Sequence, residues 1–248
     1  MTVTTTTTRA AARAAHATKR YGTAESGVTA LDDVTIEFGD GAFTAIMGPS
    51  GSGKSTLMHC LAGLDTLTSG EAFIGGIELG SLNDRDLTLL RREQVGFVFQ
   101  SFNLVPTLTA LENITLPMTL ASKGPDWAWV DIVIDTVGVR DRLTHRPSEL
   151  SGGQQQRVAV ARALASRPAI VFADEPTGNV DSRAGAEILG FLQQASRELG
   201  QTIVMVTHDP IAAGYADSAV FLADGHIIDA LDAPSAPAVL DRVKHLEG

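Results

Sequence analysis

Residues 48–56 read Gly48-Pro49-Ser50-Gly51-Ser52-Gly53-Lys54-Ser55-Thr56. This run has the spacing of a phosphate-binding loop, in which a glycine and four further residues are followed by Gly-Lys-Ser. An apolar run over 43–47 predicts a strand before it, and residues 54–64 predict a helix after it. Glycines let backbone N–H groups converge on an anion, and the helix N-terminus adds partial positive charge. The sequence therefore predicts a site that binds the phosphates of a nucleoside triphosphate with residues 48–56.

Within this loop, two side chains have distinct predicted roles. Lys54 is expected to reach the β- and γ-phosphates, and the Ser55 hydroxyl is expected to bind Mg²⁺. A small-molecule kinase, a GTPase or an ATPase would each use such a loop, so other motifs have to decide among them.

Two adjacent carboxylates, Asp174 and Glu175, follow an apolar run over 169–173. Ligands of α/β sheets bind at the carboxyl ends of strands. Because neighbouring strand residues point to opposite faces, the two carboxylates are expected to have separate tasks. Asp174 is predicted to hold Mg²⁺, directly or through water, and Glu175 to polarise the attacking water or accept its proton.

Strand and helix patterns alternate along the chain. Residues 34–38 alternate in the manner of a strand, and Gly39-Asp40-Gly41 predicts a turn, so we expect a hairpin between 34–38 and 43–47. The alternation of strands with helices predicts an α/β sandwich, with strands buried on both faces of a parallel sheet. Further strands are predicted at 95–99, 169–173, 202–206 and 219–222, and helices at 152–166 and 183–199.

The segment between Gln100 and Ser151 has no convincing strand pattern. Four prolines divide it into short pieces with helical patterns, among them 108–118 and 126–137. We expect an all-helical insertion. At its end, Ser151 is predicted to cap a helix, and Gly152 and Gly153 keep the first turn bare so that backbone donors can approach an anion.

The composition is that of a globular protein with an acidic surface. The chain has 248 residues, 44% hydrophobic residues and a formal net charge of −10. The charge argues against a whole-surface nucleic-acid binder, and we expect no nucleic-acid partner. Cys60 is the only cysteine, which excludes an internal disulfide. No uninterrupted apolar run approaches the roughly 18 residues that would span a bilayer.

The first residues differ from the rest in composition. Residues 1–20 contain four basic residues and no acidic residue, and they are rich in threonine and alanine. Such a segment offers little apolar surface to offset the entropy of ordering it. We expect residues 1–18 to form a disordered basic extension; an organelle transit peptide is the alternative.

Together these motifs resemble those of the ATP-binding-cassette (ABC) ATPases, and the resemblance covers nearly all of residues 19–230. Leu150-Ser151-Gly152-Gly153-Gln154 matches the family signature. Gln100, after Gly96-Phe97-Val98-Phe99, matches the glutamine loop, and His208 matches the switch histidine. Gly178-Asn179-Val180-Asp181 matches the loop after the carboxylate strand, although the family more often has leucine at position 180. Tyr21 lies where family members stack an aromatic ring on adenine.

The resemblance implies a fold and a domain organisation. The fold class is α/β, with a P-loop NTPase core of mainly parallel sheet, an N-terminal antiparallel β subdomain and an inserted α-helical subdomain. Residues 19–248 would form a single ABC ATPase domain, with the helical subdomain at about 104–165.

It also implies an activity and roles for residues. The chain would bind ATP and Mg²⁺, hydrolyse ATP and form a head-to-tail homodimer. Gln100 would contact Mg²⁺ or the attacking water, and His208 the γ-phosphate. The partner chain would supply Ser151, Gly152 and Gly153 to the γ-phosphate, and Asp181 would link the opposing sites.

The resemblance finally implies a separate membrane permease, which would hold the chain at the cytoplasmic face of the cell membrane. Residues 96–104 and 111–114 most resemble the lipoprotein-release and macrolide-export branch. A regulatory ATPase that signals through a membrane partner without transport is the alternative. A soluble cassette protein of translation or DNA repair is a further rival, although such proteins generally carry two cassettes or a long coiled coil.

Two tryptophans in the predicted helix over 126–137 stand apart from this pattern. Trp127 and Trp129 lie about 200° apart around a helix, so one is expected to pack inward while the other is exposed. Asp126 and Asp131 lie nearby, where relatives often have basic residues. A purely structural role is the simpler reading, and docking of a partner on the exposed ring is the alternative.

Overall fold

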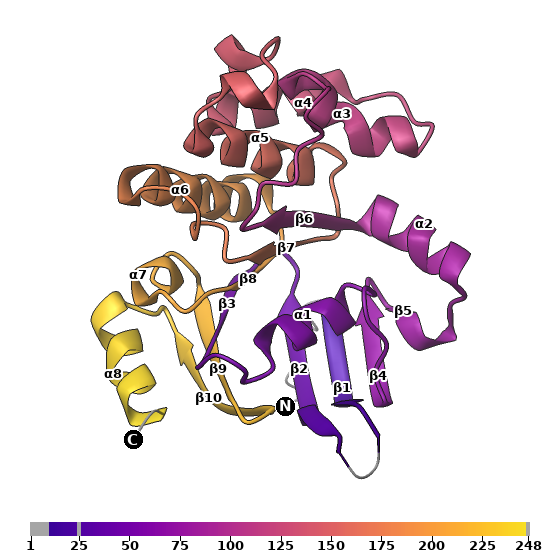
Figure 1. Ribbon diagram of the computed structural model, residues 1–248, viewed down its shortest axis with the longest axis vertical. Coiled ribbons are helices and arrows are strands. Elements are labelled where there is room, and N and C mark those ends of the chain that lie inside the picture. Colours follow the sequence, from indigo (N-terminus) through magenta and orange to yellow (C-terminus); the bar gives the residue numbers. More distant parts are fainter. Residues whose placement is uncertain (1–9, 24–25, 247–248) are drawn as a thin grey trace, which may run out of the picture.

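The computed structural model describes residues 10–23 and 26–246, arranged as two sheets below and a layer of helices above (Figure 1). The larger sheet has six strands in the order β10-β9-β3-β8-β7-β6. Its central strand β3 pairs in parallel with β8 and β9, and β7 pairs in parallel with β6 and β8. Only β10 runs antiparallel, beside β9. The strands are β3 (Phe43–Met47), β6 (Val95–Phe99), β7 (Ile170–Asp174), β8 (Ile203–Val206), β9 (Ser218–Ala223) and β10 (His226–Asp232).

The smaller sheet is antiparallel and has the order β2-β1-β4-β5. It lies beside helix α1 in the lower part of Figure 1. Its strands are β1 (Ala10–Tyr21), β2 (Val28–Gly39), β4 (Ser69–Ile74) and β5 (Ile77–Glu78).

Helices follow most strands of the larger sheet, and three of them form the upper layer. Between β6 and β7 the described chain contains no strand, only α3, α4, α5 and short 3-10 turns, as the sequence predicts. Thr109 and Glu112 close a capping box at the start of α3, and Gly138 ends α4 in the left-handed region. The helices are α1 (Lys54–Leu61), α2 (Asp84–Gln94), α3 (Ala110–Leu120), α4 (Trp127–Val137), α5 (Gly152–Ala165), α6 (Ser182–Leu199), α7 (Pro210–Ala213) and α8 (Ala236–Leu246).

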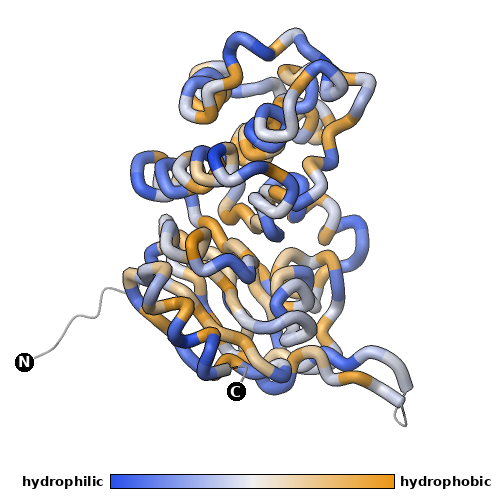
Figure 2. Tube along the Cα trace, turned by 60° about the vertical axis from the view of Figure 1, so that its left-hand side comes forward, coloured by the Kyte–Doolittle hydropathy of each residue, from blue (hydrophilic) through white to orange (hydrophobic). Residues whose placement is uncertain are grey.

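Alternate residues of the parallel strands enter two separate hydrophobic cores. In β7, Val171 and Ala173 belong to the core shared with the upper helices, whereas Ile170 and Phe172 belong to the core shared with α1 and the antiparallel sheet. Since side chains of a strand alternate between faces, the parallel sheet is buried on both sides. The strands therefore carry apolar residues at nearly every position, seen as orange tubes in the interior (Figure 2).

Two expectations are wrong. The disordered extension over 1–18 fails for residues 10–18, which lie in strand β1; residues 1–9 lie outside the described residues. The core face of β1 consists of alanines, including Ala12, Ala14 and Ala17, which share a core with the larger Leu57 and Leu61 of α1. Because these inward-facing residues are small alanines, the sequence of β1 shows no strong apolar alternation. Packing against α1 and pairing with β2 and β4 stabilise the strand.

The predicted hairpin of residues 34–38 with 43–47 is also wrong. Residues 34–38 belong to β2, which pairs with β1, whereas β3 lies in the other sheet between β8 and β9. Gly39 to Ala42 thus connects two sheets. The sequence signal of a turn was correct, but a turn does not specify which strands pair.

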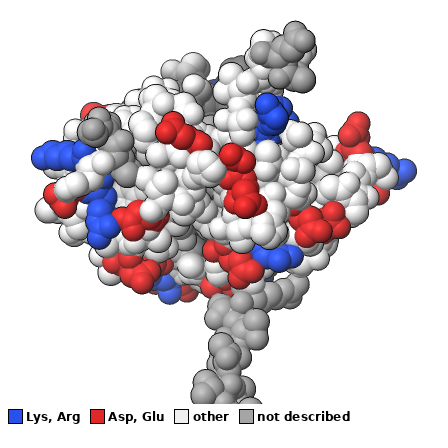
Figure 3. All heavy atoms as spheres, turned by 90° about the horizontal axis from the view of Figure 1, so that it is seen from below, with Lys and Arg blue, Asp and Glu red and all other residues white. Residues whose placement is uncertain are grey.

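Surface features agree with the composition. Acidic side chains are spread widely over the face seen in Figure 3. Within the part of the chain that the structure describes, no helix has the length and apolarity needed to cross a membrane.

Candidate nucleotide site

The phosphate loop, residues 48–56, connects the end of β3 to the start of α1. Gly48 and Gly53 have φ angles of +146° and +101°. A Cβ at Gly48 would lie 2.0 Å from the carbonyl oxygen of Leu222, and one at Gly53 would lie 2.2 Å from that of Ala30. Both positions therefore require glycine, because the backbone of two other segments closes around the loop.

Lys54 lies inside this loop and is buried. Its Nζ donates hydrogen bonds to the carbonyl oxygens of Gly48 (2.8 Å) and Pro49 (2.7 Å). Burial lowers the pKa of Lys54, and the nearby charges of Glu175 and Asp174 oppose that effect. The ammonium group is thus held at the loop by acceptors that an anionic phosphate can replace.

The carboxylate Asp174 ends β7 opposite Phe99 of β6 and Val206 of β8. Burial raises the pKa of Asp174, while charges including Lys54 and a hydrogen bond from Ser55 lower it in part. Among the described residues there is no group of three or more His, Cys, Asp and Glu side chains that would hold a metal alone. Ser55 and Asp174 fit Mg²⁺, which commonly takes few protein oxygens and completes its shell with phosphates and water.

Glu175 has a φ of +45°, in the left-handed region, directly after the strand. Its backbone N–H donates to the carbonyl of Val206 at 2.9 Å. The carboxylate contacts His208, with 2.7 Å between Oε1 and Nδ1, and accepts a hydrogen bond from the Thr207 hydroxyl at 3.3 Å. The positive φ turns the Glu175 side chain away from the strand direction, and two groups after β8 hold it there.

Gln100 follows β6 and reaches the loop after Glu175. Its Nε2 donates to Oδ1 of Asn179 at 3.3 Å, and Asn179 Nδ2 donates to the Gln100 carbonyl at 3.1 Å. Gly178 packs against the same side chain, since a Cβ there would lie 2.7 Å from Gln100 Nε2. The structure therefore joins two predicted segments, the glutamine loop and residues 178–181.

The signature segment, residues 150–154, begins helix α5 in the upper layer. Ser151 Oγ accepts from the Gln154 N–H at 3.3 Å, and Gln154 Oε1 accepts from the Ser151 N–H at 2.9 Å, which confirms the predicted cap. Ser151 is exposed and lines an open groove with Gly152, Gly153 and Asp181. Asp181 caps α6 through bonds to the N–H groups of residues 183 and 184.

The predicted site residues thus form two groups within one chain. The phosphate loop, Asp174, Glu175 and His208 meet at the carboxyl ends of β3, β7 and β8. The signature segment meets residues 179–181 in the groove instead.

One residue of this region, Gln156, has a role that the motif analysis did not assign. Gln156 is fully buried on α5, and its Nε2 donates to the carbonyls of Phe99 (3.1 Å) and Pro176 (2.6 Å). It therefore ties the signature helix to the backbone just before Gln100 and just after Glu175. The sequence signal for this role of Gln156 was its position on the buried face of the helix, four positions before the apolar Val160.

Tyr21, at the end of β1, lies near α1 with its ring partly exposed. Its hydroxyl donates to Asp65 Oδ2 at 2.6 Å. The place predicted for an adenine-stacking ring is thus at the end of an inner strand of the antiparallel sheet, next to the helix that follows the phosphate loop.

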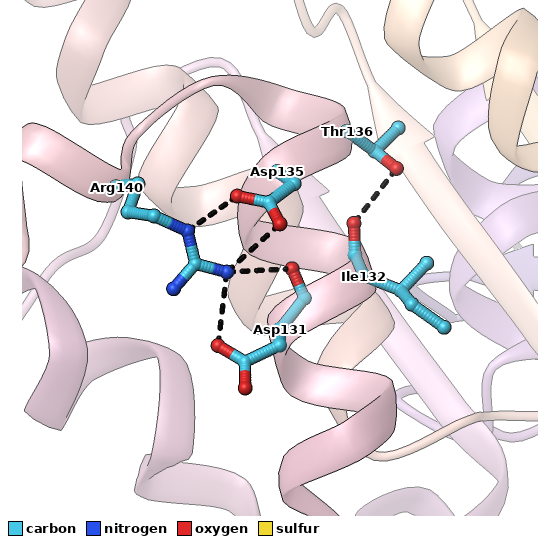
Figure 4. A network of polar contacts seen from close by, with 5 residues as sticks. All are labelled: Asp131, Ile132, Asp135, Thr136 and Arg140. Carbon is cyan, nitrogen blue, oxygen red and sulfur yellow. Dashed lines mark hydrogen bonds and ion pairs between the residues drawn. The ribbon is translucent and has the colours of Figure 1, made fainter.

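The two tryptophans of the upper layer behave as expected. Trp129 is buried, and its Nε1 donates to the Leu164 carbonyl at 2.9 Å, whereas Trp127 is 53% exposed. Asp131 is engaged within the helix end, because Arg140 binds both Asp131 and Asp135 (Figure 4). Trp129 therefore has a structural role, and only Trp127 remains available to a partner.

Comparisons with known proteins agree with these motifs. The family described as ABC transporter matches residues 31–178. An uncharacterised ABC transporter ATP-binding protein of Methanocaldococcus jannaschii, MJ1508, is 45% identical over 216 residues, which is 86% of this chain and 96% of the relative. The macrolide export ATP-binding/permease protein MacB of Marinobacter nauticus is 43% identical over 86% of this chain and 33% of its own length.

Two solved structures are similar to the fold. The dimeric ATP-binding cassette MJ0796, in a post-hydrolysis state with ADP and Pi, has a TM-score of 0.80 and 40% identity over 90% of this chain and 98% of its own. CbiO1 of Clostridium perfringens, part of the ABC transporter complex cbiONQ, has a TM-score of 0.81 and 26% identity over 96% of this chain and 95% of its own. The family match and these relatives show that the chain belongs to the ABC transporter family, as one of its ATP-binding proteins.

Proposed function

We propose that this protein hydrolyses ATP as a head-to-tail homodimer and thereby drives a separate membrane permease. The observation that carries the proposal is the meeting of the phosphate loop with Asp174, Glu175 and His208 at one edge of the parallel sheet. The exposed signature segment of the same chain lies in another groove. A second chain can therefore bring its signature segment to the phosphates.

Nucleotide binding in this proposal uses the phosphate loop and the residues around it. The N–H groups of the phosphate loop and the start of α1 surround the phosphates, and Lys54 exchanges its carbonyl acceptors for phosphate oxygens. Ser55 and Asp174 would hold Mg²⁺, and Gln100 would be a further ligand or would contact the attacking water. When bound, Mg²⁺ neutralises charge on the β- and γ-phosphates.

In the hydrolysis step, Glu175 acts as the general base. Its carboxylate accepts a proton from water, and Thr207 and His208 fix its orientation. The His208 side chain is 77% exposed. It can also turn its ring toward the γ-phosphate, where it stabilises charge in the transition state.

The second half of each site comes from the partner chain. Gly152 and Gly153 present the bare first turn of α5, and Ser151 adds a hydroxyl beside them. Asp181, at the start of α6 in the same groove, lies where the two sites would face each other. Binding of ATP then holds the dimer together, and hydrolysis releases it.

Coupling to a membrane protein is proposed from the relatives. One relative is a MacB protein named as both ATP-binding protein and permease, and one similar structure is part of a transporter complex. In this protein the permease is a separate chain of the export or lipoprotein-release type, and the ATPase is held by it at the cytoplasmic face of the membrane.

The test is ATP turnover by Glu175→Gln. We expect ATP binding to persist, turnover to fall by on the order of 100-fold or more, and an ATP-bound dimer to accumulate in sedimentation experiments. Glu198→Gln, at an exposed carboxylate near the end of α6, is the matched control and should hydrolyse ATP normally. Normal turnover by Glu175→Gln would remove Glu175 from its assigned role.

A further inference from the structure

The end of β1 and the segment after α1 form a polar cluster of Lys19, Tyr21, Asp65 and Thr66. Lys19 Nζ lies 2.5 Å from Asp65 Oδ1 and donates to the Thr66 carbonyl at 2.7 Å. The Tyr21 hydroxyl donates to the other carboxylate oxygen of Asp65 at 2.6 Å. One carboxylate thus binds two side chains of β1 across 44 to 46 positions of sequence.

The cluster fixes the Tyr21 ring at both its tip and one face. The hydroxyl contacts Asp65 and also Thr56, in the first turn of α1 after Ser55. Lys19 Nζ lies over the ring, 4.8 Å from its centroid, and the Lys19 side chain is only 12% exposed. Lys19 lies over one face of the ring, and Tyr21 is still 43% exposed, which leaves ring surface on which a flat group can stack.

At neutral pH, Asp65 and Tyr21 are in the protonation states that their hydrogen bond requires. Burial alone would raise the pKa of Asp65, but hydrogen bonds from its neighbours outweigh it and lower that pKa. The hydrogen bond to Asp65 and burial raise the pKa of Tyr21. Asp65 is therefore an ionised acceptor, and the Tyr21 hydroxyl keeps the proton that it donates.

We propose that Asp65, together with Lys19, is a positioning residue that holds the Tyr21 ring so that the base of a bound nucleotide stacks on its open face. The inference rests on the proposed ATP site. Asp65 acts through Tyr21 and does not contact the nucleotide. Tyr21 in turn links the bound base to the phosphate loop, because its hydroxyl contacts Thr56 of that loop. A rigid ring loses less entropy on binding than a mobile one, which is how the cluster strengthens binding.

The experiment compares Mg²⁺-ATP with Mg²⁺-tripolyphosphate, which has phosphates and no base. Equilibrium dissociation constants are measured for the full chain and for Tyr21→Ala, Asp65→Ala and the double variant. We expect Tyr21→Ala to weaken ATP binding by roughly tenfold, because the base loses the ring on which it stacks. Asp65→Ala should weaken ATP binding several-fold, and neither variant should change tripolyphosphate binding.

The ATP affinity of the double variant distinguishes a positioning role of Asp65 from a merely structural one. If Asp65 acts through the ring, adding Asp65→Ala to Tyr21→Ala causes no further loss of ATP affinity. Asp65→Asn keeps an acceptor for Tyr21 but loses the charge that binds Lys19, so it should lie between wild type and Asp65→Ala. Asp33→Asn is the matched control, because Asp33 is an exposed carboxylate of β2 bonded to His16 of β1.

The outcomes separate this inference from the proposed function. Equal losses for ATP and tripolyphosphate in Asp65→Ala, or additive losses in the double variant, would overturn the positioning role. So would a wild-type chain that binds ATP no more tightly than tripolyphosphate. A wild-type chain that binds neither compound would overturn the proposed function and this inference together.

Discussion

The phosphate loop and the signature segment are both glycine-rich helix starts, yet the protein surrounds them differently. At the phosphate loop, the backbone of Leu222 in β9 closes on Gly48, and the backbone of Ala30 in β2 closes on Gly53. At the signature segment, Ser151 is exposed, and a Cβ at Gly152 would meet only ordinary contacts, the nearest at 3.6 Å from the Phe102 ring. The phosphate loop is enclosed by backbone of its own chain, whereas the signature segment faces an open groove.

The same residue type therefore serves two purposes in this protein. Gly48 and Gly53 of the phosphate loop are required by the fold, so their replacement should damage stability and binding together. Gly152 of the signature segment is not required by the fold, so its replacement should damage only a step that involves a second chain.

The largest effect is expected for Gly48→Ala. The added Cβ would lie 2.0 Å from a backbone oxygen of Leu222, at a φ of +146°. We expect the free energy of unfolding to fall by roughly 3 kcal/mol or more, with loss of ATP binding, as measured by urea denaturation and calorimetry.

The matched control is Gly51→Ala in the same loop. Gly51 also has a positive φ, +81°, but a Cβ there would meet nothing within 4 Å. Its unfolding free energy should fall by only about 1–2 kcal/mol, the strain of the backbone alone. Equal losses for the two variants would mean that the close packing around Gly48 is unimportant.

An intermediate effect is expected for Gly152→Ala. Since this position has neither a positive φ nor a close contact, stability and ATP binding by the single chain should be unchanged. Turnover should fall by roughly tenfold or more, because the bare helix turn can no longer approach the partner's phosphate. Gly190→Ala, at a helical glycine of α6 with nothing within 4 Å, should leave turnover unchanged. Loss of ATP binding in Gly152→Ala would contradict the separation of the two halves.

The smallest effect concerns the charge at Asp174. Burial raises the pKa of Asp174, so its ionised form costs stability in the nucleotide-free protein. Asp174→Asn should therefore increase the unfolding free energy at pH 7, by less than about 1 kcal/mol because solvent screens this partly exposed group, while weakening Mg²⁺-ATP binding.

The stability gain of Asp174→Asn should change with pH in one direction only. Below the ordinary aspartate pKa the group is protonated in both folded and unfolded chains, so the gain should vanish there. It should grow as pH rises through the raised pKa and stay constant above it. Denaturation measured from pH 3 to 7 checks this, and a gain that increases toward low pH would contradict it.

Much of the phosphate-loop half could be predicted from sequence, because its residues are contiguous and their spacing reflects backbone geometry. The strand before Gly48, the helix after it and the cap at Ser151 are all local features, and the structure confirms them. The signature helix and the all-helical segment before it follow from local patterns in the same way.

The remaining features depend on contacts between distant segments. Strand β1 was missed because its core face is alanine and its stability comes from α1 and its neighbouring strands. The pairing of β3 with β8 and β9 was missed because a turn signal carries no information about partners. The bonds of Asp65 to β1 and of Gln156 to two loops join residues 20 to 57 positions apart, and no local spacing predicts them.

The most direct test of the central claim, that the two half-sites meet between chains, is a crosslinking experiment. Cysteines are introduced by Ser50→Cys in the phosphate loop and Ser151→Cys in the signature segment, in a Glu175→Gln, Cys60→Ala background. Native Cys60 is buried, and burial raises the pKa of its thiol to about 12, so its replacement removes little reactivity. With a short bis-maleimide, we expect a dimer on denaturing gels that forms with Mg²⁺-ATP and not without nucleotide. Crosslinking only within single chains, or to the same extent without ATP, would contradict it.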